Sequence, residues 1–563
     1  MESLIEVPVL IVGGGPVGLA MAIELSHRGI ECMLVERSDG TIEHPRTGLV
    51  AVRTMEAFRR WGFAERVRNC GFPDDYDLSM VFCTSLNGLV LEREAYPSMK
   101  EAPTPPETPE KKQRCPQMWL QPIMADVAWE SRGVNIKYRH QFVSFEDQGT
   151  SVDTQLTELD SGKSVTVRSQ YLIGCDGAAS KVREALDIGM QGKLLSYSVN
   201  ILMRAPGLIN YHSMGEGERY LFVGPEGTWG NLTVVDGNEI WRLTVLGSEQ
   251  KLDLSTFDAD AYVRRAFGRG DIPFEVLSVV PWRRSEMLAD RYRAGRVLLA
   301  GDSLHTMSPT GGMGMNTGIQ EVLDLGWKLQ AVLQGWGDDA LLDSYEIERR
   351  PIALRNIEFS SANFRAWLDA PDPAAVCDDT PEGERVRREI GKRMRDSTRV
   401  EWESLGLQIG YRYEDSPICV PDGTPPLPDD YSHYQPTTRP GSRAPHAWLP
   451  DGRSTLDLFG KDFVLVAFSS ASCSDIDKLA KAFSEKKVPL SMVRLADPTI
   501  EQLYERCLVL VRPDGHVAWR GNAVVDAGLI ADTVRGAAAH RHGTALQSRD
   551  GANANTGSLT TAA

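Results

Sequence analysis

The sequence predicts an α/β protein in which a mainly parallel sheet is interleaved with an antiparallel sheet and followed by a smaller α/β segment. Short apolar runs at 7–12 and 31–36 enclose a glycine turn and a helical pattern, and this βαβ order is typical of a parallel sheet. Runs of Val, Leu, Trp and Tyr separated by turn residues fill 193–281 and predict the antiparallel sheet. A further buried strand at 296–300 leads into a glycine-rich turn and a long helix.

Composition excludes several kinds of partner and site. The chain has 563 residues, enough for roughly three or four domains, and its formal net charge of −16 argues against nucleic acid as the main partner. Nine cysteines without CxxC spacing and ten histidines without a ligand motif indicate neither a disulfide framework nor a metal site. The uncharged stretch 7–23 is rich in glycine, so we interpret it as strand, turn and helix rather than as a membrane span. We expect a cytoplasmic protein with no metal, no membrane and no nucleic-acid partner.

The first glycine turn has the spacing of a dinucleotide-binding loop. Gly13, Gly15 and Gly18 follow the first strand and open a helix, with Pro16 in its first turn. The first glycine permits the tight turn, the second lets a pyrophosphate approach the backbone, and the third allows close packing of helix on strand. The start of the helix offers free N–H groups to phosphate. Glu36, at the end of the second strand, is placed to accept hydrogen bonds from ribose hydroxyls.

Two later motifs extend this site and separate FAD from NAD as its ligand. Asp176-Gly177 follows a strand and precedes a hydroxyl and an arginine, Ser180 and Arg183. Gly301-Asp302 follows the strand at 296–300 and precedes the glycine-rich turn at 309–316. A carboxylate at the end of a strand can bind polyol hydroxyls, and exposed backbone N–H groups can hold the polar edge of a ring.

The three motifs, in this order, resemble those of the group A flavoprotein aromatic hydroxylases, the para-hydroxybenzoate hydroxylase and phenol hydroxylase superfamily. The resemblance covers about residues 5–370. It implies a Rossmann-like FAD-binding domain interleaved with an antiparallel-sheet substrate domain, one tightly held FAD, NAD(P)H as reductant and O₂ as oxidant. In the mechanism that it implies, a C4a-hydroperoxide of the flavin hydroxylates an electron-rich ring, while the protein orients the small aromatic substrate and excludes water.

The resemblance also implies roles for individual residues. The expected FAD contacts are Glu36 at the adenosine ribose, Arg37 beside it, Arg46 near the flavin and the entering nicotinamide, Gln117 at the ribityl–phosphate portion, Asp176 in a motif linked to FAD and NAD(P)H, Asp302 at the ribityl chain, and the backbone of Gly312, Met313, Gly314, Met315 and Asn316 at the isoalloxazine edge. The backbone carbonyl of Pro309 is expected to face the flavin and the substrate. Ser180 and His305 are expected to form helix caps or local hydrogen bonds.

The sequence defines the substrate side of the site less well. Phenol hydroxylases place an aspartate after the arginine loop, but residues 46–56 hold no acid at the equivalent position. This departure argues against simple phenol as the substrate and leaves the general base unknown. The antiparallel sheet carries four large aromatic residues that we name as candidates for the substrate pocket: Tyr220, Phe222, Trp229 and Trp241.

The C-terminal segment resembles the thioredoxin-like tail domain of phenol-hydroxylase-type members at 441–446, 457–460 and 509–521. Thioredoxin activity needs two cysteines separated by two residues, whereas the stretch 470–475 has Cys473 alone. We therefore expect a structural or dimer-contact role for this module. Its presence favours the phenol hydroxylase branch, which includes halophenol and nitrocatechol hydroxylases and enzymes that tailor aromatic polyketides.

These observations divide the chain into regions: 1–75, 116–190 and 285–370 for the FAD-binding domain, 76–115 and 191–284 for the substrate domain, 371–439 for a helical region and linker, 440–540 for the thioredoxin-like domain, and 541–563 for a disordered tail. The expected function is NAD(P)H- and FAD-dependent hydroxylation of a substituted phenol or catechol-type aromatic, with a homodimer left open. The alternatives are a hydroxylase or Baeyer–Villiger oxygenase of an aromatic polyketide, a flavin dehydrogenase or oxidase without oxygen insertion, and a non-catalytic FAD-binding sensor.

Overall fold

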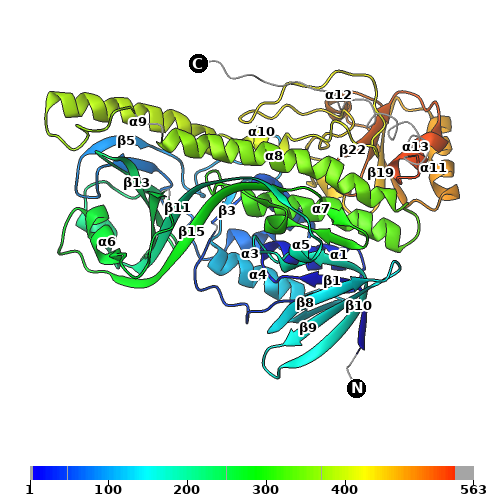
Figure 1. Cartoon of the computed structure of the whole chain (residues 1–563). Helices are drawn as coiled ribbons and strands as arrows, with labels where there is room; N and C mark the ends of the chain where they lie inside the picture. Colours follow the sequence, from blue (N-terminus) through cyan, green and yellow to red (C-terminus); the bar gives the residue numbers. More distant parts are fainter. Residues whose placement is uncertain (1–3, 47, 249, 369–370, 539–563) are drawn as a thin grey trace, which may run out of the picture.

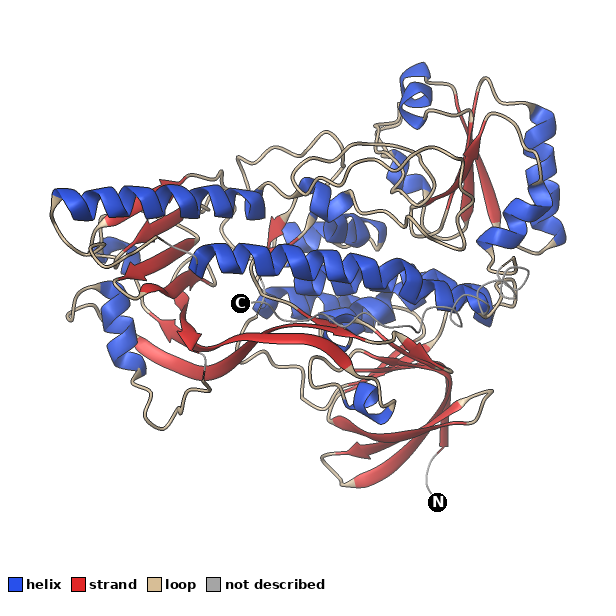
Figure 2. Cartoon of the chain, turned by 45° about the horizontal axis from the view of Figure 1, so that its top comes forward, coloured by secondary structure: helices blue, strands red, loops and turns tan. Residues whose placement is uncertain are grey.

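The computed structural model describes residues 4–46, 48–248, 250–368 and 371–538, so the tail expected at 541–563 lies outside the described residues. Two eight-stranded sheets and a four-stranded sheet organise the chain. The long helix α8 (Ala340–Leu368) runs across both large sheets, α9 (Pro381–Trp402) lies over the second, and the C-terminal sheet lies at the far end of the molecule from α9 (Figures 1 and 2). This arrangement confirms the predicted α/β class.

The first sheet carries the glycine turn. Its main path is β16-β17-β10-β1-β2-β7. β17, β10, β1, β2 and β7 are parallel, which confirms the parallel sheet predicted from the βαβ pattern. β8 and β9 continue from β10 as an antiparallel ribbon. The strands are β1 (Leu4–Val12), β2 (Cys32–Val35), β7 (Val134–Lys137), β8 (His140–Asp147), β9 (Val152–Glu158), β10 (Lys163–Gly174), β16 (Arg293–Ala294) and β17 (Val297–Leu299). Packed around them are α1 (Pro16–His27), α4 (Gln117–Glu130), α5 (Lys181–Ala185) and α7 (Met313–Leu333).

The second sheet has the order β18-β15-β11-β14-β13-β12-β4-β5. Its strands are β4 (Met80–Cys83), β5 (Val90–Glu94), β11 (Met190–Arg204), β12 (Arg219–Gly224), β13 (Gly227–Val234), β14 (Ile240–Ser248), β15 (Glu275–Ala289) and β18 (His305–Thr306). The sheet is mixed rather than wholly antiparallel, because β4 pairs with β12 in parallel. β4 and β12 are far apart in the chain, so no hairpin fixes their direction.

Shorter elements connect the two large sheets. They are α2 (Val52–Arg60), α3 (Ala64–Arg68), α6 (Ala259–Phe267), α10 (Leu405–Ile409), the two-stranded pair β3 (Leu49–Val50) and β6 (Gln113–Arg114), and the 3₁₀ turns η1 (Leu208–Tyr211), η2 (Gly301–Ser303) and η3 (Thr455–Leu458). A continuous core of buried apolar side chains joins the first and second sheets. The two sheets are therefore packed as one body.

The C-terminal domain is a small α/β unit with its own apolar core. Its sheet has the order β20-β19-β21-β22, in which only β19 and β20 are parallel. The elements are β19 (Phe463–Phe468), α11 (Cys473–Glu485), β20 (Leu490–Leu495), α12 (Pro498–Tyr504), β21 (Leu508–Val511), β22 (Val517–Gly521) and α13 (Ala527–Val534). Cys473 is the exposed first residue of α11, and Arg494 donates to its sulfur.

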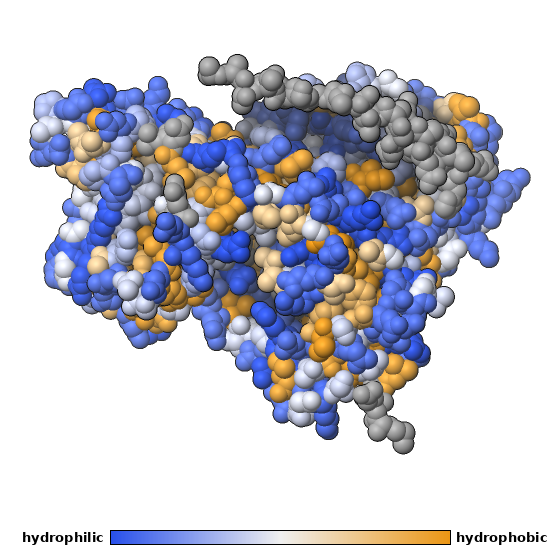
Figure 3. Space-filling model, viewed as in Figure 1, coloured by the Kyte–Doolittle hydropathy of each residue, from blue (hydrophilic) through white to orange (hydrophobic). Residues whose placement is uncertain are grey.

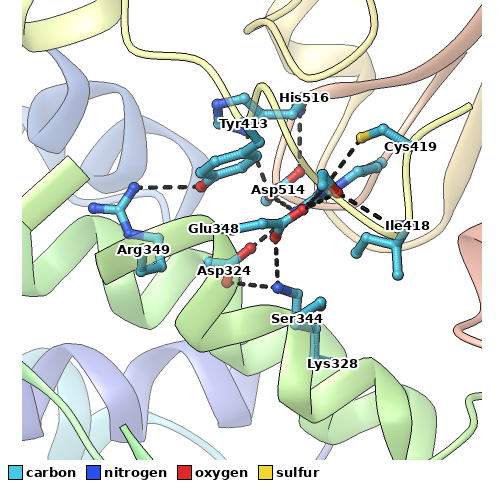
Figure 4. A network of polar contacts seen from close by, with 12 residues as sticks. Asp324, Lys328, Ser344, Glu348, Arg349, Tyr413, Ile418, Cys419, Asp514 and His516 are labelled. Atoms are coloured by element: carbon cyan, nitrogen blue, oxygen red, sulfur yellow. Dashed lines mark hydrogen bonds and ion pairs between the residues drawn. The ribbon is translucent and has the colours of Figure 1, made fainter. Parts of the chain in front are cut away.

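A buried network of charges joins this domain to α7 and α8 (Figure 4). Arg512, which follows β21, donates to Glu348 Oε1 (2.5 Å), Asp324 Oδ1 (2.8 Å) and Asp514 Oδ2 (2.7 Å). Lys328 Nζ donates to Asp324 (2.7 Å) and Glu348 (2.6 Å). Burial raises the pKa of Asp324 to about 8, although Lys328 and Arg512 oppose the shift. Arg512 and Lys328 therefore each donate to two or more carboxyl groups, so both cations of this network have negative partners.

The surface visible in Figure 3 mixes apolar groups with a hydrophilic majority. No helix in the described part of the chain is both long and apolar enough to cross a membrane. Within the same ranges, no three His, Cys, Asp or Glu side chains come together in a way that could hold a metal ion.

Candidate active site

The glycine turn between β1 and α1 is shaped by close packing on one side and openness on the other. Gly13 has a φ of +111°, and a Cβ there would lie 2.3 Å from the carbonyl oxygen of Cys175. A Cβ on Gly18 would lie 1.9 Å from the carbonyl oxygen of Gly13, so the helix packs directly on the turn. By contrast, apart from its own neighbours in the chain, no described residue has an atom within 4 Å of the Cβ position of Gly15. Since no side chain caps α1, which starts at Pro16, its first N–H groups are open to a phosphate.

Glu36 lies beside this turn at the end of β2. Its carboxylate accepts hydrogen bonds from the backbone N–H of Gly14 (2.7 Å) and of Ser38 (2.8 Å). It is half-buried, whereas Arg37 next to it is exposed. The predicted ribose-binding acid therefore adjoins the predicted phosphate-binding backbone.

A chain of amide hydrogen bonds brings two further predicted residues to the same turn. The backbone N–H of Arg46 donates to Gln117 Oε1 (2.9 Å), Gln117 Nε2 donates to Gln121 Oε1 (3.0 Å), and Gln121 Nε2 contacts the carbonyl of Gly14 (3.5 Å). Arg46 itself is exposed, with its guanidinium 5.7 Å from the ring centroid of Trp282 on β15. Helix α4 thus connects the arginine loop to the glycine turn.

Asp176 organises the turn after β10. Its carboxylate accepts from Ser180 Oγ (2.5 Å) and from the backbone N–H groups of Lys181 (2.7 Å) and Val182 (3.2 Å). Ser180 in turn caps α5 by accepting from the N–H of Arg183 (2.9 Å), as its expected capping role requires. Arg183 donates to the carbonyl of Ser303 (2.9 Å), which joins this turn to the one that holds Asp302.

Asp302 lies in η2, directly after β17, with an exposed carboxylate. The surrounding protein raises the pKa of this carboxylate by limiting its hydration, while the positive charges of the nearby His305 and Arg46 lower it. His305 is fully buried and contacts Glu321 Oε1 (2.9 Å), whose other oxygen accepts from the N–H of Gly301 (2.8 Å). His305 therefore stabilises the turn at Gly301–Asp302 from the protein interior, through Glu321. The side chain of Asp302 faces outward.

The glycine-rich loop ends at a second open helix start. Gly312 has a φ of +66° and precedes α7, whose first turn has no side-chain cap. A Cβ on Gly314 would lie 4.0 Å from Asp302 Oδ1, so the helix start and the carboxylate are neighbours. Met313 is buried in the core, while Gly314 and Met315 are partly exposed. Pro309 is exposed, and its carbonyl accepts from the N–H of Gly312 (3.0 Å).

Asn316 has a structural role that its motif did not reveal. Its Oδ1 accepts from the N–H of Ala51 (2.9 Å) and from Thr54 Oγ1 (2.7 Å), and its Nδ2 donates to the carbonyl of Gly312 (2.7 Å). The side chain is fully buried. Asn316 therefore ties the start of α2 to the loop, and only its backbone is left for a cofactor.

These features fit FAD. The turns after β1, β10 and β17 follow neighbouring parallel strands, so they share the carboxyl edge of the first sheet, where dinucleotides bind in such folds. Along this edge lie an open glycine backbone at Gly15, an acid at Glu36, an outward carboxylate at Asp302 and the uncapped start of α7. Each can hold a part of the cofactor without moving a buried group.

A cavity lies between the second sheet and this edge. It is lined by His44, Pro45, Arg46, Asn200, Arg219, Asn231, Thr233, Arg242, Thr244, Trp282, Arg284, Pro309, Thr310 and Trp367. None of these described lining residues is acidic. The lining joins the arginine loop, five strands of the second sheet, the loop before α7 and the end of α8, so the cavity borders the carboxyl edge of the first sheet.

The four aromatic residues expected to line the pocket lie on the opposite face of the sheet, and the expectation is corrected accordingly. Tyr220, Phe222, Trp229 and Trp241 are buried, with Trp229 against Tyr262 of α6. Successive side chains of a strand point to opposite faces, so Arg219 and Arg242 face the cavity while their neighbours Tyr220 and Trp241 face the core. Counting alternate positions from the polar residues of β12 and β14 would have placed Tyr220, Phe222 and Trp241 on the face opposite the cavity, but not Trp229, which lies at a register irregularity of β13.

Comparisons with known proteins agree with this geometry. The FAD binding domain family matches residues 6–360, and the aromatic-ring hydroxylase C-terminal family matches residues 437–545. The chain is 34% identical to a putative polyketide hydroxylase from Streptomyces halstedii, with 95% of this chain and 97% of that one covered. It is 33% identical to the 4-methyl-5-nitrocatechol 5-monooxygenase of a Burkholderia species, with 93% and 95% covered. The rebeccamycin biosynthetic enzyme RebC with reduced flavin superimposes with a TM-score of 0.88 and 40% identity, covering 95% of this chain and 100% of that one.

Proposed function

The chain belongs to the FAD-binding aromatic-ring hydroxylases, flavoprotein monooxygenases that use NAD(P)H and O₂, and we propose that it oxygenates a substituted, multi-ring hydroxyaromatic in the second-sheet cavity. The observation that carries this proposal is the position of Arg46. It lines the cavity, and it also lies close enough to Asp302 to affect the pKa of that carboxylate. A ring in the cavity and a cofactor along the sheet edge would therefore be neighbours.

In this proposal FAD lies along the carboxyl edge of the first sheet. The open backbone at Gly15 and the start of α1, in the turn that Gly13 and Gly18 shape, would hold its pyrophosphate, and Glu36 would hold its adenosine ribose. Asp302 would accept from the ribityl hydroxyls, and the free N–H groups at the start of α7 would hold the flavin edge. Bound FAD, reduced by NAD(P)H, would supply the activation of O₂.

Flavin retention tests this placement. Replacing Asp302 by Ala removes an outward carboxylate that no described side chain uses as an ion-pair partner, so the protein should fold but lose bound flavin. We expect the ratio of flavin absorbance to protein absorbance after gel filtration to fall several-fold. The exposed pair Arg139–Asp160 supplies a control, since Asp160→Ala should keep full occupancy. Full occupancy in Asp302→Ala would contradict the assignment.

The chain's own residues would orient the substrate and handle its hydroxyl proton. Pro309 and Thr310 close the cavity on the cofactor side, and Trp282 and Trp367 offer aromatic surface. His44 contacts Ser278 Oγ through Nδ1 (3.1 Å), and its buried Nε2 has no partner among the described residues. Burial lowers the pKa of His44 to about 4, with Arg242 and Arg46 contributing, so the ring is neutral at pH 7. With Nδ1 donating to Ser278, Nε2 can accept a hydrogen bond from a substrate hydroxyl.

The proposed substrate is a multi-ring aromatic rather than a simple phenol. No carboxylate lines the cavity among the described residues, so the acid that phenol hydroxylases use has no counterpart there. Glu56, the one acid in 46–56, is held by Arg53 and Arg443 at the C-terminal domain instead. The similarity to a putative polyketide hydroxylase supports the larger substrate class. A nitrocatechol-type substrate is the second candidate, supported by the Burkholderia relative.

Oxygen incorporation tests the proposed reaction. The purified protein, loaded with FAD and given NADH or NADPH under ¹⁸O₂, is incubated with hydroxynaphthalenes, hydroxyanthracenes and nitrocatechols, and the products are analysed by mass spectrometry. We expect one ¹⁸O atom in the product of a multi-ring compound. Loss of two hydrogens without ¹⁸O would identify a dehydrogenase instead and would contradict the proposal.

A further inference from the structure

The cavity wall formed by the second sheet is unusually rich in arginine. Arg219 on β12 and Arg242 on β14 both flank Thr233 of β13, so they occupy one row across three neighbouring strands. Strands are spaced about 4.8 Å apart, which puts their Cα atoms roughly 10 Å from each other. Arg284 on β15 lines the same cavity. Three guanidinium groups therefore surround one space.

These arginines have few partners within the protein. Arg242 donates to the carbonyl of Pro45 (2.9 Å) and Arg284 to Ser308 Oγ (2.8 Å), both of which are neutral acceptors. The Nε atoms of Arg219, Arg242 and Arg284 are buried without a hydrogen-bond partner among the described residues. A buried guanidinium is rare in proteins unless it is paired, because desolvation penalises its charge. Donors are therefore available to something that enters the cavity.

The negative charge near these arginines is also too small to balance their positive charge. Only Arg219 has a carboxylate partner within the described chain, Glu401 of α9, at 3.5 Å. Burial raises the pKa of Glu401 to about 7, so even this charge is incomplete at neutral pH. Burial, together with the neighbouring Arg219 and Arg242, lowers the pKa of Arg284 to about 9, although Glu401 opposes the shift. At least two positive charges, those of Arg242 and Arg284, thus have no carboxylate partner among the described residues.

The remaining wall is suited to an aromatic ring. Trp367 lies under Arg219, with 5.4 Å between the guanidinium carbon and the ring centroid, and Trp282 lies under Arg46 at 5.7 Å. Trp282 and Trp367 also line the cavity, next to Pro309. The site therefore offers apolar surface and a group of planar cationic donors together.

We propose that the substrate of this enzyme is an aromatic carboxylic acid whose carboxylate is bound by Arg219, Arg242 and Arg284. The inference rests on the proposed function, because it takes the cavity as the substrate site. Guanidinium groups match the two oxygens of a carboxylate with paired N–H donors, and a carboxylate supplies the missing negative charge. A phenolate has a single oxygen and uses fewer of the available donors.

Matched acids and esters test this inference on the FAD-loaded protein. The probes are 4-hydroxybenzoate, 3-hydroxy-2-naphthoate and 3-hydroxyanthracene-2-carboxylate, each beside its methyl ester, with dissociation constants taken from the change in the bound flavin's absorption spectrum. The ester keeps the ring and the hydroxyl but not the charge. We expect at least one acid to bind tenfold or more tightly than its ester.

Three variants test which residues bind the carboxylate. Arg284→Met and Arg242→Met should each weaken acid binding at least tenfold and leave ester binding unchanged. Arg204→Gln is the control, because Arg204 is an exposed residue of the same sheet that pairs with Glu239 and Glu275. It should change neither constant. If Arg284→Met does not fold, Arg242→Met carries the test alone.

The outcomes separate this inference from the proposed function. Equal binding of every acid and its ester, no binding of any acid, or equal weakening by Arg204→Gln would overturn the inference. Oxygenation of esters as readily as acids under ¹⁸O₂ would also overturn it, while the monooxygenase proposal would stand. An acid bound through these arginines that gains no ¹⁸O would support the recognition and contradict the proposed reaction.

Discussion

Two buried groups of charges in this molecule contain the same kind of cation in opposite surroundings. Arg512 of the C-terminal domain pairs with Asp324 of α7, with Glu348 of α8 and with Asp514. Arg284, in the cavity wall, pairs with no carboxylate in the described parts of the chain. Both side chains have a buried Nε without a partner among the described residues, but Arg512 donates to three carboxyl groups, whereas Arg284 donates to the neutral hydroxyl of Ser308. A balanced group holds domains together, whereas an unbalanced one is suited to a charged ligand.

The largest expected effect is at Arg512. Its replacement by Met leaves Glu348 with Lys328 and Asp514 with His516 as their remaining partners, and removing one partner of a buried ion pair costs about 4 kcal/mol. We expect the free energy of unfolding in urea to fall by that amount. Arg535→Met, which breaks the more exposed pair with Asp532, should cost less than about 1 kcal/mol. A similarly small change for both variants would show that the ion pairs of Arg512 do not stabilise the folded protein.

A smaller effect of opposite sign is expected at Arg284. In the ligand-free protein its charge is desolvated without compensation, and Met keeps packing against Phe364, which lies 4.0 Å below the guanidinium carbon. Replacing a poorly compensated buried charge by an apolar side chain should raise the free energy of unfolding by about 1 kcal/mol. Urea unfolding without added ligand measures it. Destabilisation as large as that of Arg512→Met would mean that Arg284 is also structural.

The smallest effect is a pH dependence set by Glu401. The charged groups that face it are Arg219, Arg284 and Glu218. Because burial raises its pKa to about 7, Glu401 is mostly neutral below pH 7 and ionised above it, where it competes with a bound carboxylate for Arg219. Acid binding should therefore weaken about threefold between pH 6 and pH 8. Glu401→Gln should make binding independent of pH over this range, and an unchanged slope would contradict the assignment.

Local motifs made much of the first sheet predictable. The turn at Gly13–Gly18 and the acid at Glu36 lie within one βαβ unit, so spacing along the chain sets their geometry. The capping role of Ser180 is also local, because its partner is three residues away. The structure brings Arg46 and Gln117 together at the same turn, although they are far apart in the chain.

The cavity and the domain interface depend on contacts that the sequence does not encode locally. Trp229 lies at a register irregularity between β12 and β13, so strand alternation alone does not give the face it occupies. Arg512 and Asp324 are 188 positions apart in the sequence, and no sequence motif predicts their ion pair. The aromatic residues of the second sheet were the more conspicuous candidates, but large apolar side chains on a half-buried strand most often form the core.

If the cavity arginines bind the negative charge of a ligand, an aromatic acid should stabilise the folded protein through Arg284. Urea unfolding of the FAD-loaded wild-type protein and of Arg284→Met is compared with and without a saturating concentration of the aromatic acid that binds best. We predict that the acid stabilises the wild-type protein strongly and the variant little, so that the variant is the more stable protein without the acid and the less stable one with it. Equal stabilisation of both proteins by the acid would contradict the account.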